Sequence, residues 1–417
     1  MAADTYPLIK AFRALRPHAG SAAGVIAPPY DVIDTAEARA LAAGRPDSFL
    51  RISRPEIEFP DGTDAHSDAV YARGRSNLER LRRQGTLIRD ADPSFYVYQM
   101  TMGTHVQTGL ALTASVRAYE LNRVRKHELT KPIKENDRVR NIETLDAQTG
   151  PVLSAYRADA RIAALLEDAA REAPLFTVQG HHEVTHRLWQ VAEGERVQAL
   201  VAAFEDLDAL YIADGHHRSA AAARVAAARR VAQSDAKGDE PHEYFLSVAF
   251  PHDELEILDY NRAVSDLNGL SAAALRAAIA ERFTVDALPH ARKPAKRGDF
   301  SMYLDGRWYG LSLDPAARPK DPVAGLDVSV LQQRLIEPLL GVADPRTDAR
   351  IDFVGGVRGL GELQDRVESG RDAVAFALYP TSMIELMAVA DAQLLMPPKS
   401  TWFEPKLADG LLSHLLK

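Results

Sequence analysis

The sequence contains no cysteine among its 417 residues. Disulfides, thiolate metal ligands and cysteine nucleophiles are therefore excluded. Long apolar runs are missing as well: no stretch reaches the roughly 20 apolar residues needed to cross a bilayer, and the N-terminus lacks the continuous apolar segment of a secretory signal. We therefore expect a cytoplasmic protein without a membrane partner.

An excess of basic charge is also absent. The chain has 50 Lys and Arg residues against 58 Asp and Glu residues, for a net charge of −8. A dedicated nucleic-acid-binding protein usually carries a basic patch or stripe, so we predict no nucleic-acid partner, although a local basic cleft stays open. The hydrophobic fraction of 46% over this length is enough to build two or three domains, each with its own core.

Neither of the two common glycine patterns for nucleotide binding occurs. The chain has no G-x-x-x-x-G-K-[ST], and Gly355, Gly356, Gly359 and Gly361 do not fit G-x-G-x-x-G. A Walker or Rossmann site therefore has no support. We interpret the glycine-rich segment as a flexible loop before a helix at Leu363, and a mobile lid over an active site is the alternative.

One apparent metal motif is predicted not to bind metal. Residues His182–His186 match H-E-x-x-H, which binds zinc only on a helix, because there positions i and i+4 lie on one face about 5–6 Å apart. Gly180 precedes the motif, Val184 and Thr185 are β-branched, and the alternation that follows is typical of a strand. On a strand the two histidines would lie roughly 13 Å apart. We predict an exposed strand here, and no set of side-chain metal ligands elsewhere.

Strand and helix patterns alternate irregularly along the chain, which favours a mixed α+β fold over a doubly wound sheet. Residues 95–102 and 109–116 predict one β-hairpin, and Asp305-Gly306 is the turn dipeptide of another within 299–313. Asp34 and Glu37 form a helix-starting capping box. Further helices are predicted around 69–83, 158–172, 271–283 and 381–392, a strand at 373–380, and a polar stretch from 122 to 149.

The stretch Asp-Gly-His-His-Arg-Ser at 214–219 concentrates titratable chemistry at one turn. The residues before it predict a strand, its glycine permits a tight turn, and helix formers begin near Ser219. A strand, a turn and a helix N-terminus form a natural anion site, because free N–H groups and the positive end of the helix dipole point outward. An arginine fork matches phosphate oxygens. The candidate phosphate-binding residues are Gly215, His216, His217, Arg218 and Ser219. The alternative is that these side chains only cap and decorate a surface helix.

This turn resembles the signature turn of the ParB/sulfiredoxin-like fold, which implies that it holds nucleotide phosphates. Sulfiredoxins carry a cysteine in their version of the turn, so that activity is excluded. Free L-serine kinases of the same fold carry the Asp-Gly-His-His-Arg form. Lys126-His127-Glu128 is similar to the segment that supplies their catalytic glutamate, and Pro398-Lys399-Ser400-Thr401 to the segment that helps hold serine and its phosphate. Across its whole length, including residues 27–33 and 396–406, the chain also resembles a bacterial family known only as a domain of unknown function.

The resemblance implies a small-molecule kinase that transfers a phosphoryl group from ATP or ADP to the hydroxyl of free L-serine or a similar compound. Glu128 would accept the hydroxyl proton, since the cations beside it would keep it ionised. Asp214 would organise Mg²⁺ or the reacting hydroxyl, with Mg²⁺ held mainly through the phosphates. Lys399, Ser400 and Thr401 would bind the acceptor. A ParB-like nucleotide switch and a phosphate-ester hydrolase or nuclease stay open, as do a capping role for Asp214 and a solvated-loop role for Glu128.

The kinase resemblance covers roughly residues 94–407, and the first 90 residues have no counterpart in those kinases. We expect an N-terminal module at 1–91, a ParB/sulfiredoxin-like nucleotide-binding domain at 92–268, and a smaller α+β domain at 269–417 that closes over it. Pro28-Pro29 in the module forces an extended segment. Tyr30 and Asp31, which follow, are candidate substrate-binding residues, and packing is the alternative role.

Overall fold

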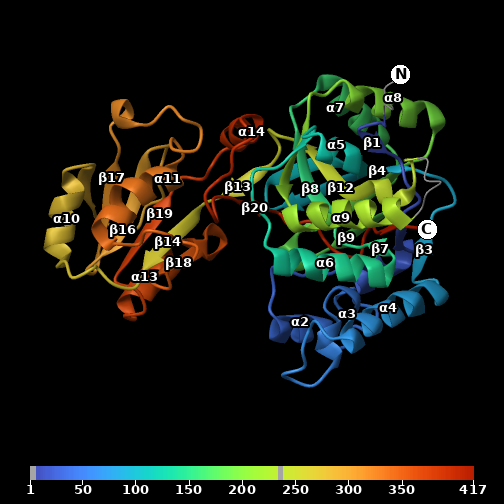
Figure 1. Ribbon diagram of the computed structural model, residues 1–417, viewed down its shortest axis with the longest axis horizontal. Coiled ribbons are helices and arrows are strands. Elements are labelled where there is room, and N and C mark those ends of the chain that lie inside the picture. The colour runs from blue at the N-terminus through green and yellow to red at the C-terminus, as the bar shows by residue number, and fades with distance from the viewer. Residues whose placement is uncertain (1–5, 233–237) are drawn as a thin grey trace. The chain divides into compact units, whose positions relative to one another are not determined.

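The computed structural model describes residues 6–232 and 238–417. The chain folds as two compact units: unit 1 comprises the residues up to Leu255 together with Pro405–Lys417, and unit 2 comprises Glu256–Glu404. Unit 1 contains a large mixed sheet and unit 2 an antiparallel one (Figure 1). The predicted mixed α+β class is therefore confirmed.

The main sheet of unit 1 has nine strands in the order β6-β11-β8-β12-β5-β4-β10-β9, with β1 paired to β5. The strands are β1 (Ile9–Lys10), β4 (Phe95–Met102), β5 (His105–Ser115), β6 (Val124–Arg125), β8 (Val152–Tyr156), β9 (Phe176–Gln179), β10 (Thr185–Val191), β11 (Leu210–Asp214) and β12 (Tyr244–Pro251). The predicted hairpin is present as β4 and β5. The pairs β6–β11 and β8–β12 are parallel and the other pairs are antiparallel.

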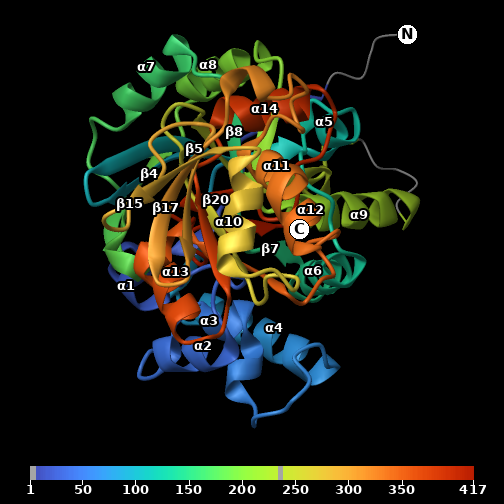
Figure 2. The same cartoon turned by 90° about the vertical axis from the view of Figure 1, so that its left-hand side faces the viewer.

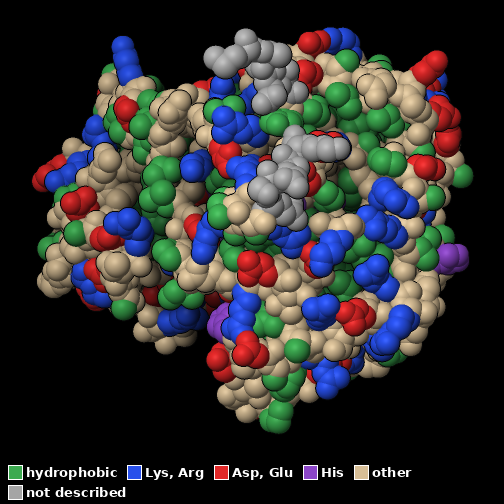
Figure 3. Space-filling model, turned by 45° about the vertical axis from the view of Figure 1, so that its right-hand side comes forward, with side chains coloured by type: hydrophobic (Ala, Val, Ile, Leu, Met, Phe, Trp, Pro, Cys, Tyr) green, Lys and Arg blue, Asp and Glu red, His purple; other side chains and the backbone are tan. Residues whose placement is uncertain are grey.

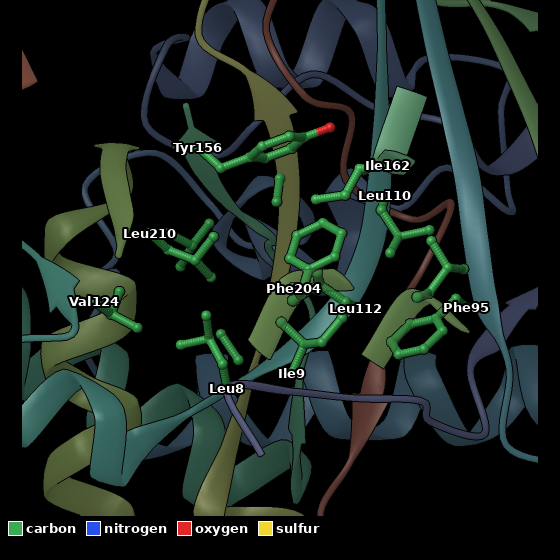
Figure 4. Close-up of a cluster of buried hydrophobic side chains, with 14 of the residues drawn as sticks. Leu8, Ile9, Phe95, Leu110, Leu112, Val124, Tyr156, Ile162, Phe204 and Leu210 are labelled. Carbon is green, nitrogen blue, oxygen red and sulfur yellow. The ribbon is translucent and has the colours of Figure 1, made fainter. Parts of the chain in front are cut away.

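Helices pack against this sheet around one apolar core. Beyond the N-terminal segment they are α5 (Val116–Glu120), α6 (Pro132–Leu145), α7 (Ala160–Ala169), α8 (Gly194–Glu205) and α9 (His216–Ala232). Figure 4 shows the core side chains converging, among them Leu8, Ile9, Phe95, Leu110, Leu112, Val124, Tyr156, Ile162, Phe204 and Leu210. Burying one such large apolar side chain contributes about 1.5–3 kcal/mol. This core supports the strands whose ends carry the candidate site.

The N-terminal segment is helical and packs beside α6. It contains α1 (Ala22–Val25), α2 (Thr35–Ala42), α3 (Leu50–Ser53) and α4 (Asp68–Arg83), and a small sheet of β2 (Leu15–Pro17) and β3 (Leu87–Arg89). The predicted capping box of Asp34 and Glu37 is present at the start of α2. In two views at right angles, α4 lies next to α6, and α3 lies next to α4 (Figures 1 and 2).

Helix α6 lies inside the stretch that the sequence pattern marks only as polar. Few of its positions are apolar. Ile142 and Leu145 are buried, whereas the residues of the first turns are mostly charged. Pro132 occupies the first helical position, where a missing N–H costs nothing. The weak periodicity explains why the sequence pattern does not predict this helix.

The C-terminal tail returns to unit 1. Strand β21 (His414–Leu415) pairs with β7 (Ala147–Gln148), and further bridges join Leu15 to Ser413 and Ala27 to Asp409. The predicted domain at 269–417 thus ends in a segment that the structure assigns to unit 1. The tail lies there because its leucines fill the interior of unit 1. The division into three domains otherwise stays a prediction.

Unit 2 contains a six-stranded antiparallel sheet in the order β15-β17-β16-β19-β14-β18, and a two-stranded ribbon of β13 and β20. The strands are β13 (Glu256–Leu258), β14 (Tyr260–Val264), β15 (Thr284–Leu288), β16 (Asp299–Leu304), β17 (Arg307–Ser312), β18 (Ile351–Gly355), β19 (Val374–Leu378) and β20 (Trp402–Glu404). The helices are α10 (Ala272–Ala280), α11 (Asp327–Leu331), α12 (Glu337–Leu340), α13 (Gly359–Glu368) and α14 (Met383–Asp391). The hairpin with the Asp305-Gly306 turn is present as β16 and β17.

The predicted helix at Leu363 is present as α13, but it begins earlier than expected, so the glycine-rich segment is not a single loop. Gly355 ends β18, a short 3₁₀ turn covers Gly356–Arg358, and α13 begins at Gly359. A Cβ at Gly356 would lie 2.7 Å from the backbone carbonyl oxygen of Asp259. Gly356 is therefore explained by close backbone packing in unit 2.

The H-E-x-x-H segment does not lie on a helix long enough to align its histidines. A 3₁₀ turn covers His181–Glu183, where His182 has a φ of 51°, and β10 begins at Thr185. The prediction of an exposed strand is wrong in two respects: the motif begins in a turn, and His186 is buried. The Nδ1 atom of His186 lies 2.8 Å from the hydroxyl of Tyr98, and burial lowers the pKa of His186 to about 4. This histidine is a core residue.

The surface carries both signs of charge. On the face shown in Figure 3, Lys and Arg side chains are numerous, with acidic and hydrophobic side chains between them. Within the described residues, no helix combines the length and the apolar character that a membrane crossing requires.

Candidate functional site

The Asp-Gly-His-His-Arg turn joins a buried strand directly to a long helix. Strand β11 ends at Asp214, and α9 begins at His216, three residues before the predicted start. Gly215 has a φ of 98°, which favours glycine, and a Cβ there would lie 3.3 Å from the Cα atom of Val152. The turn therefore places the N-terminus of α9 at the end of the sheet.

Glu128 reaches this turn because two strands run in parallel. Val124–Arg125 of β6 pairs in parallel with Leu210–Tyr211 of β11, so both chains leave the sheet at the same edge. A carboxylate oxygen of Glu128 lies 4.0 Å from Nδ1 of His216, and the Glu128 side chain is 53% exposed. The structure therefore brings together two motifs that are far apart in the sequence.

Both histidines of the turn are neutral near pH 7. Burial lowers the pKa of His216 well below its usual value, and the neighbouring His127 lowers it further. The backbone N–H of His127 donates to Nε2 of His216 over 3.4 Å, which leaves the ring proton on Nδ1, the atom that faces Glu128. His127 packs edge-on against His216 with ring centroids 4.5 Å apart.

His217 is held in a similar way. Its Nε2 accepts a hydrogen bond from the backbone N–H of Lys131 over 3.0 Å, and burial together with Lys134 lowers its pKa. The two histidines therefore offer neutral N–H donors to an anion, rather than the positive charge that the sequence pattern suggested.

Arg218 points into unit 1. Its Nη1 donates to the backbone oxygen of Pro151, its Nη2 lies 3.3 Å from a carboxylate oxygen of Asp31, and its side chain is 11% exposed. Burial lowers the pKa of Arg218, but Asp31 and Asp214 outweigh this effect, and the pKa is raised overall. The guanidinium thus ties two chain segments to the turn, and the predicted phosphate contact stays a prediction.

The two ends of the turn have structural partners. Asp214 accepts a hydrogen bond from Nζ of Lys406 over 3.0 Å. Burial raises the pKa of Asp214, but Lys406 and Arg218 lower it by more, so the carboxylate is ionised. Ser219 is fully buried, and its hydroxyl donates to the backbone oxygen of His216 over 3.0 Å. This hydroxyl shapes the first turn of α9.

Three residues near the turn are not predicted from the sequence: Lys406 and Asp409 from the tail, and Arg138 from α6. Asp409 is buried near Gly150 and Arg218, and burial raises its pKa to about 7. Lys406 lies in the segment at 396–406 that supports the whole-length resemblance, which is the only signal the sequence offers. Arg138 and Asp409 belong to no recognisable motif.

Tyr30 lies near two guanidinium groups. Its ring centroid is 3.8 Å from the guanidinium carbon of Arg138 and 5.9 Å from that of Arg218. Tyr30, Arg138, Gly150, Arg218 and Asp409 line a cavity of about 30 Å³. This volume suits about one water molecule, so a nucleotide would have to bind on the open side of the turn.

Lys399, Ser400 and Thr401 lie in unit 2. The backbone oxygen of Lys399 accepts a hydrogen bond from Arg262 over 2.9 Å, and its Nζ lies 5.7 Å from the ring centroid of Tyr260. Ser400 is buried, and its hydroxyl donates to the backbone oxygen of Pro397 over 2.6 Å. Arg262 therefore fixes the backbone of this segment, and the amino group of Lys399 extends over an aromatic ring.

Comparison with known proteins identifies the family. A family profile described as a protein of unknown function, DUF1015, matches residues 9–329. The chain belongs to the DUF1015 family. The predicted membership in a family of unknown function is thereby confirmed. No curated protein sequence matches the chain.

Several solved structures resemble this DUF1015 protein distantly. A free serine kinase in complex with AMP shares 13% identity at a TM-score of 0.34, covering 72% of this chain and 89% of the kinase. SbnI from Staphylococcus aureus, truncated at its C-terminus, shares 10% identity at a TM-score of 0.38, covering 72% and 85%. A conserved hypothetical protein from Pyrococcus furiosus shares 14% identity at a TM-score of 0.33, covering 74% and 96%. At these TM-scores the similarity establishes neither a shared activity nor a shared ligand.

Proposed function

We propose that this DUF1015 protein is a small-molecule kinase built on a ParB/sulfiredoxin-like nucleotide-binding domain. It would transfer a phosphoryl group from ATP or ADP to the hydroxyl of a small acceptor, with free L-serine as the first candidate. The observation that carries the proposal is the convergence of Glu128 with the turn at 214–219, at the ends of two parallel strands. An ionisable base and a helix N-terminus thereby share one edge of the sheet.

The turn suits the binding of phosphate groups. The N-terminus of α9, with the positive end of the helix dipole, follows directly after the end of β11. His216 and His217 add neutral ring donors, which bind an anion without needing a proton from solution. Phosphoryl transfer asks mainly for such positioned donors, because little covalent chemistry falls to the protein.

Mg²⁺ would neutralise phosphate charge in this reaction, but the side chains of the site could supply it with few ligands. Asp214 is ionised, but Lys406 already occupies one of its oxygens. We therefore assign the cation mainly to the phosphates of the nucleotide, with Asp214 as a candidate ligand through its second oxygen.

Glu128 is the proposed general base. Its half-exposed carboxylate would take the proton of the acceptor hydroxyl while the acceptor oxygen bonds to the terminal phosphorus and the bridging P–O bond breaks. The nucleotide then leaves with one phosphate fewer. Lys399, Ser400 and Thr401, with Tyr30 and Asp31, stay predictions for acceptor binding.

Product formation followed by phosphorus NMR tests the proposal. The protein is incubated with ATP or ADP, Mg²⁺ and one acceptor from L-serine, L-threonine, homoserine and glycerate. We expect phosphoserine. Phosphorylation of another acceptor would support the kinase activity but contradict serine as the substrate. Release of inorganic phosphate without a phosphorylated acceptor would indicate a hydrolase. Nucleotide binding without turnover would indicate a switch.

The Glu128→Gln variant tests the mechanism in the same assay. General-base assistance is typically worth about 10²–10⁴-fold, so turnover should fall by that range while nucleotide affinity stays nearly unchanged. Glu195→Gln, on the exposed side of α8, is the matched control. Full activity of Glu128→Gln on every accepted substrate would contradict the assigned role.

A further inference from the structure

A second, larger cavity lies between the N-terminal segment and α6, all within unit 1. Its volume is about 230 Å³, and its walls include Tyr30, Arg54, Glu56, Tyr71, Arg138 and Asn141. Four of its lining residues, Tyr30, Ser53, Arg138 and Asn141, also line the small cavity beside Arg218. The volume is below the range of about 300–1,000 Å³ that suits drug-sized ligands, so the cavity fits a small metabolite.

Polar groups line this cavity without protein hydrogen-bond partners. Asn141 is 8% exposed, and its side-chain amide makes no hydrogen bond to any described residue. The same holds, among the residues described, for the hydroxyl of Tyr30 and for Nη1 of Arg138, whose other donors bind Asp137. These polar groups are therefore available to a molecule bound in the cavity.

The same cavity also offers acceptors. Glu56 uses one carboxylate oxygen to accept from Arg54 over 2.7 Å, and its second oxygen has no partner within the described chain. The donors of Arg54 are consumed by protein groups, namely Glu56, the backbone oxygens of Tyr30 and Ile33, and the hydroxyl of Thr35. Arg54 is therefore a structural residue, and Arg138 is the cation with a spare donor.

The charges of the lining balance. Two arginines, Arg54 and Arg138, face two carboxylates, Glu56 and Asp137, and His66 adds a titratable ring that contacts Asp137. A free phosphate or a simple carboxylate would satisfy Arg138 but would leave the spare oxygen of Glu56 facing another anion. A molecule with one negative and one positive group satisfies both Arg138 and Glu56.

We propose that this cavity is a binding site for a small zwitterion of the α-amino acid class. Its carboxylate would accept hydrogen bonds from Arg138 and Asn141, and its ammonium group would donate to Glu56. The site would bind its ligand whether or not the turn at 214–219 transfers phosphoryl groups, so it stands independently of the proposed kinase function.

Calorimetric titration of the full-length protein with each standard amino acid, at millimolar concentration, tests the proposal. The best binder is then compared with the same molecule lacking its ammonium group and with the same molecule lacking its carboxylate. We expect one or a few amino acids to bind, and both analogues to bind at least about tenfold more weakly, because each loses a charge-assisted hydrogen bond.

Two variants locate the site. Asn141→Leu preserves the shape without breaking a protein hydrogen bond, and Glu56→Gln removes the negative charge; each should weaken binding about tenfold. Glu143→Gln, exposed on the same helix and outside the cavity, should bind normally. The proposal is overturned if no amino acid binds, which would leave the cavity to water. It is also overturned if the analogue without ammonium binds equally, or if Asn141→Leu retains full affinity.

Discussion

At the scale of single residues, the candidate site is built from groups whose protonation the fold has set. Burial keeps His216 and His217 neutral, whereas Lys406 and Arg218 keep Asp214 ionised. Because each of these buried histidines is neutral, its ring donates one hydrogen bond in one direction. The turn is therefore prepared for an anion by geometry more than by net charge.

Arg218 is expected to affect stability as well as ligand binding. Hydrogen bonds to charged groups contribute about 1.5–3 kcal/mol, and Arg218 binds Asp31 and Pro151. We expect Arg218→Ala to lower the free energy of unfolding by this order, measured by urea denaturation, and to weaken nucleotide binding.

The control for Arg218 is His181→Ala. His181 lies in the 3₁₀ turn at 181–183, away from the candidate site, and should leave both quantities unchanged. Equal effects of the two substitutions would show that the turn at 214–219 has no special role in binding.

Asp409 predicts a pH dependence of stability. Burial raises its pKa from 3.8 to about 7, so between these values the folded chain holds a proton that the unfolded chain has lost. The stabilisation is complete below the unfolded pKa and is lost as the pH rises through about 7, with a slope of about 1.4 kcal/mol per pH unit. Asp409→Asn removes this titration.

The measurement is the difference in unfolding free energy between Asp409→Asn and the unmodified chain. It should grow in favour of the variant as the pH rises from about 4 to about 7. Subtraction cancels the titration of buried histidines such as His414. A difference independent of pH in this window would contradict the raised pKa.

At the scale of elements, the connection from β11 to α9 decides the position of the site. The parallel pairing of β6 with β11 brings the loop with Glu128 to the same edge, and the glycine between β11 and α9 allows the chain to reverse without a spacer. The site thus depends on one backbone conformation more than on any single charged side chain.

Gly215→Ala tests that dependence. The φ of 98° is strained for any L side chain, so we expect a loss of about 1–3 kcal/mol in stability and a loss of nucleotide binding. Gly361→Ala is the opposite case, since Gly361 lies within α13 with open space around it, and should stabilise by about 0.5–1 kcal/mol. Both are read from urea denaturation. If Gly215→Ala left stability and nucleotide binding unchanged, the turn would tolerate another backbone conformation.

At the scale of the whole molecule, unit 1 is completed by the last residues of the chain. Leu411, Leu412, Leu415 and Leu416 are buried in it, and Lys406 and Asp409 reach the candidate site from the same tail. The fold of unit 1 and the chemistry of its site therefore require the chain to pass through unit 2 and return.

Leu412→Ala measures how much the tail contributes. Leu412 is 2% exposed, and truncation of a buried leucine costs about 2–5 kcal/mol. We expect the unfolding midpoint of unit 1 in urea to fall accordingly. Leu394→Ala, at an exposed leucine of unit 2, should change stability by less than about 0.5 kcal/mol. Equal effects would show that the tail is dispensable.

Local patterns in the sequence determined much of the fold. The capping box at α2, the hairpins β4–β5 and β16–β17, and the strand-turn-helix at Gly215 were all predictable, because each depends on neighbouring residues and on side-chain period. The sequence also limits the chemistry open to the chain, because it lacks cysteine and carries the Asp-Gly-His-His-Arg turn.

Tertiary structure alone decided what lies beside that turn. Helix α6, with Arg138, has too few apolar positions to be recognised, and Lys406 and Asp409 come from a tail that the pattern placed in another domain. The inward direction of Arg218 and the neutral state of both histidines follow from burial, and burial depends on contacts between segments distant in the sequence. The sequence therefore identifies the residue types of the site, whereas their charge states and partners are set only by the folded structure.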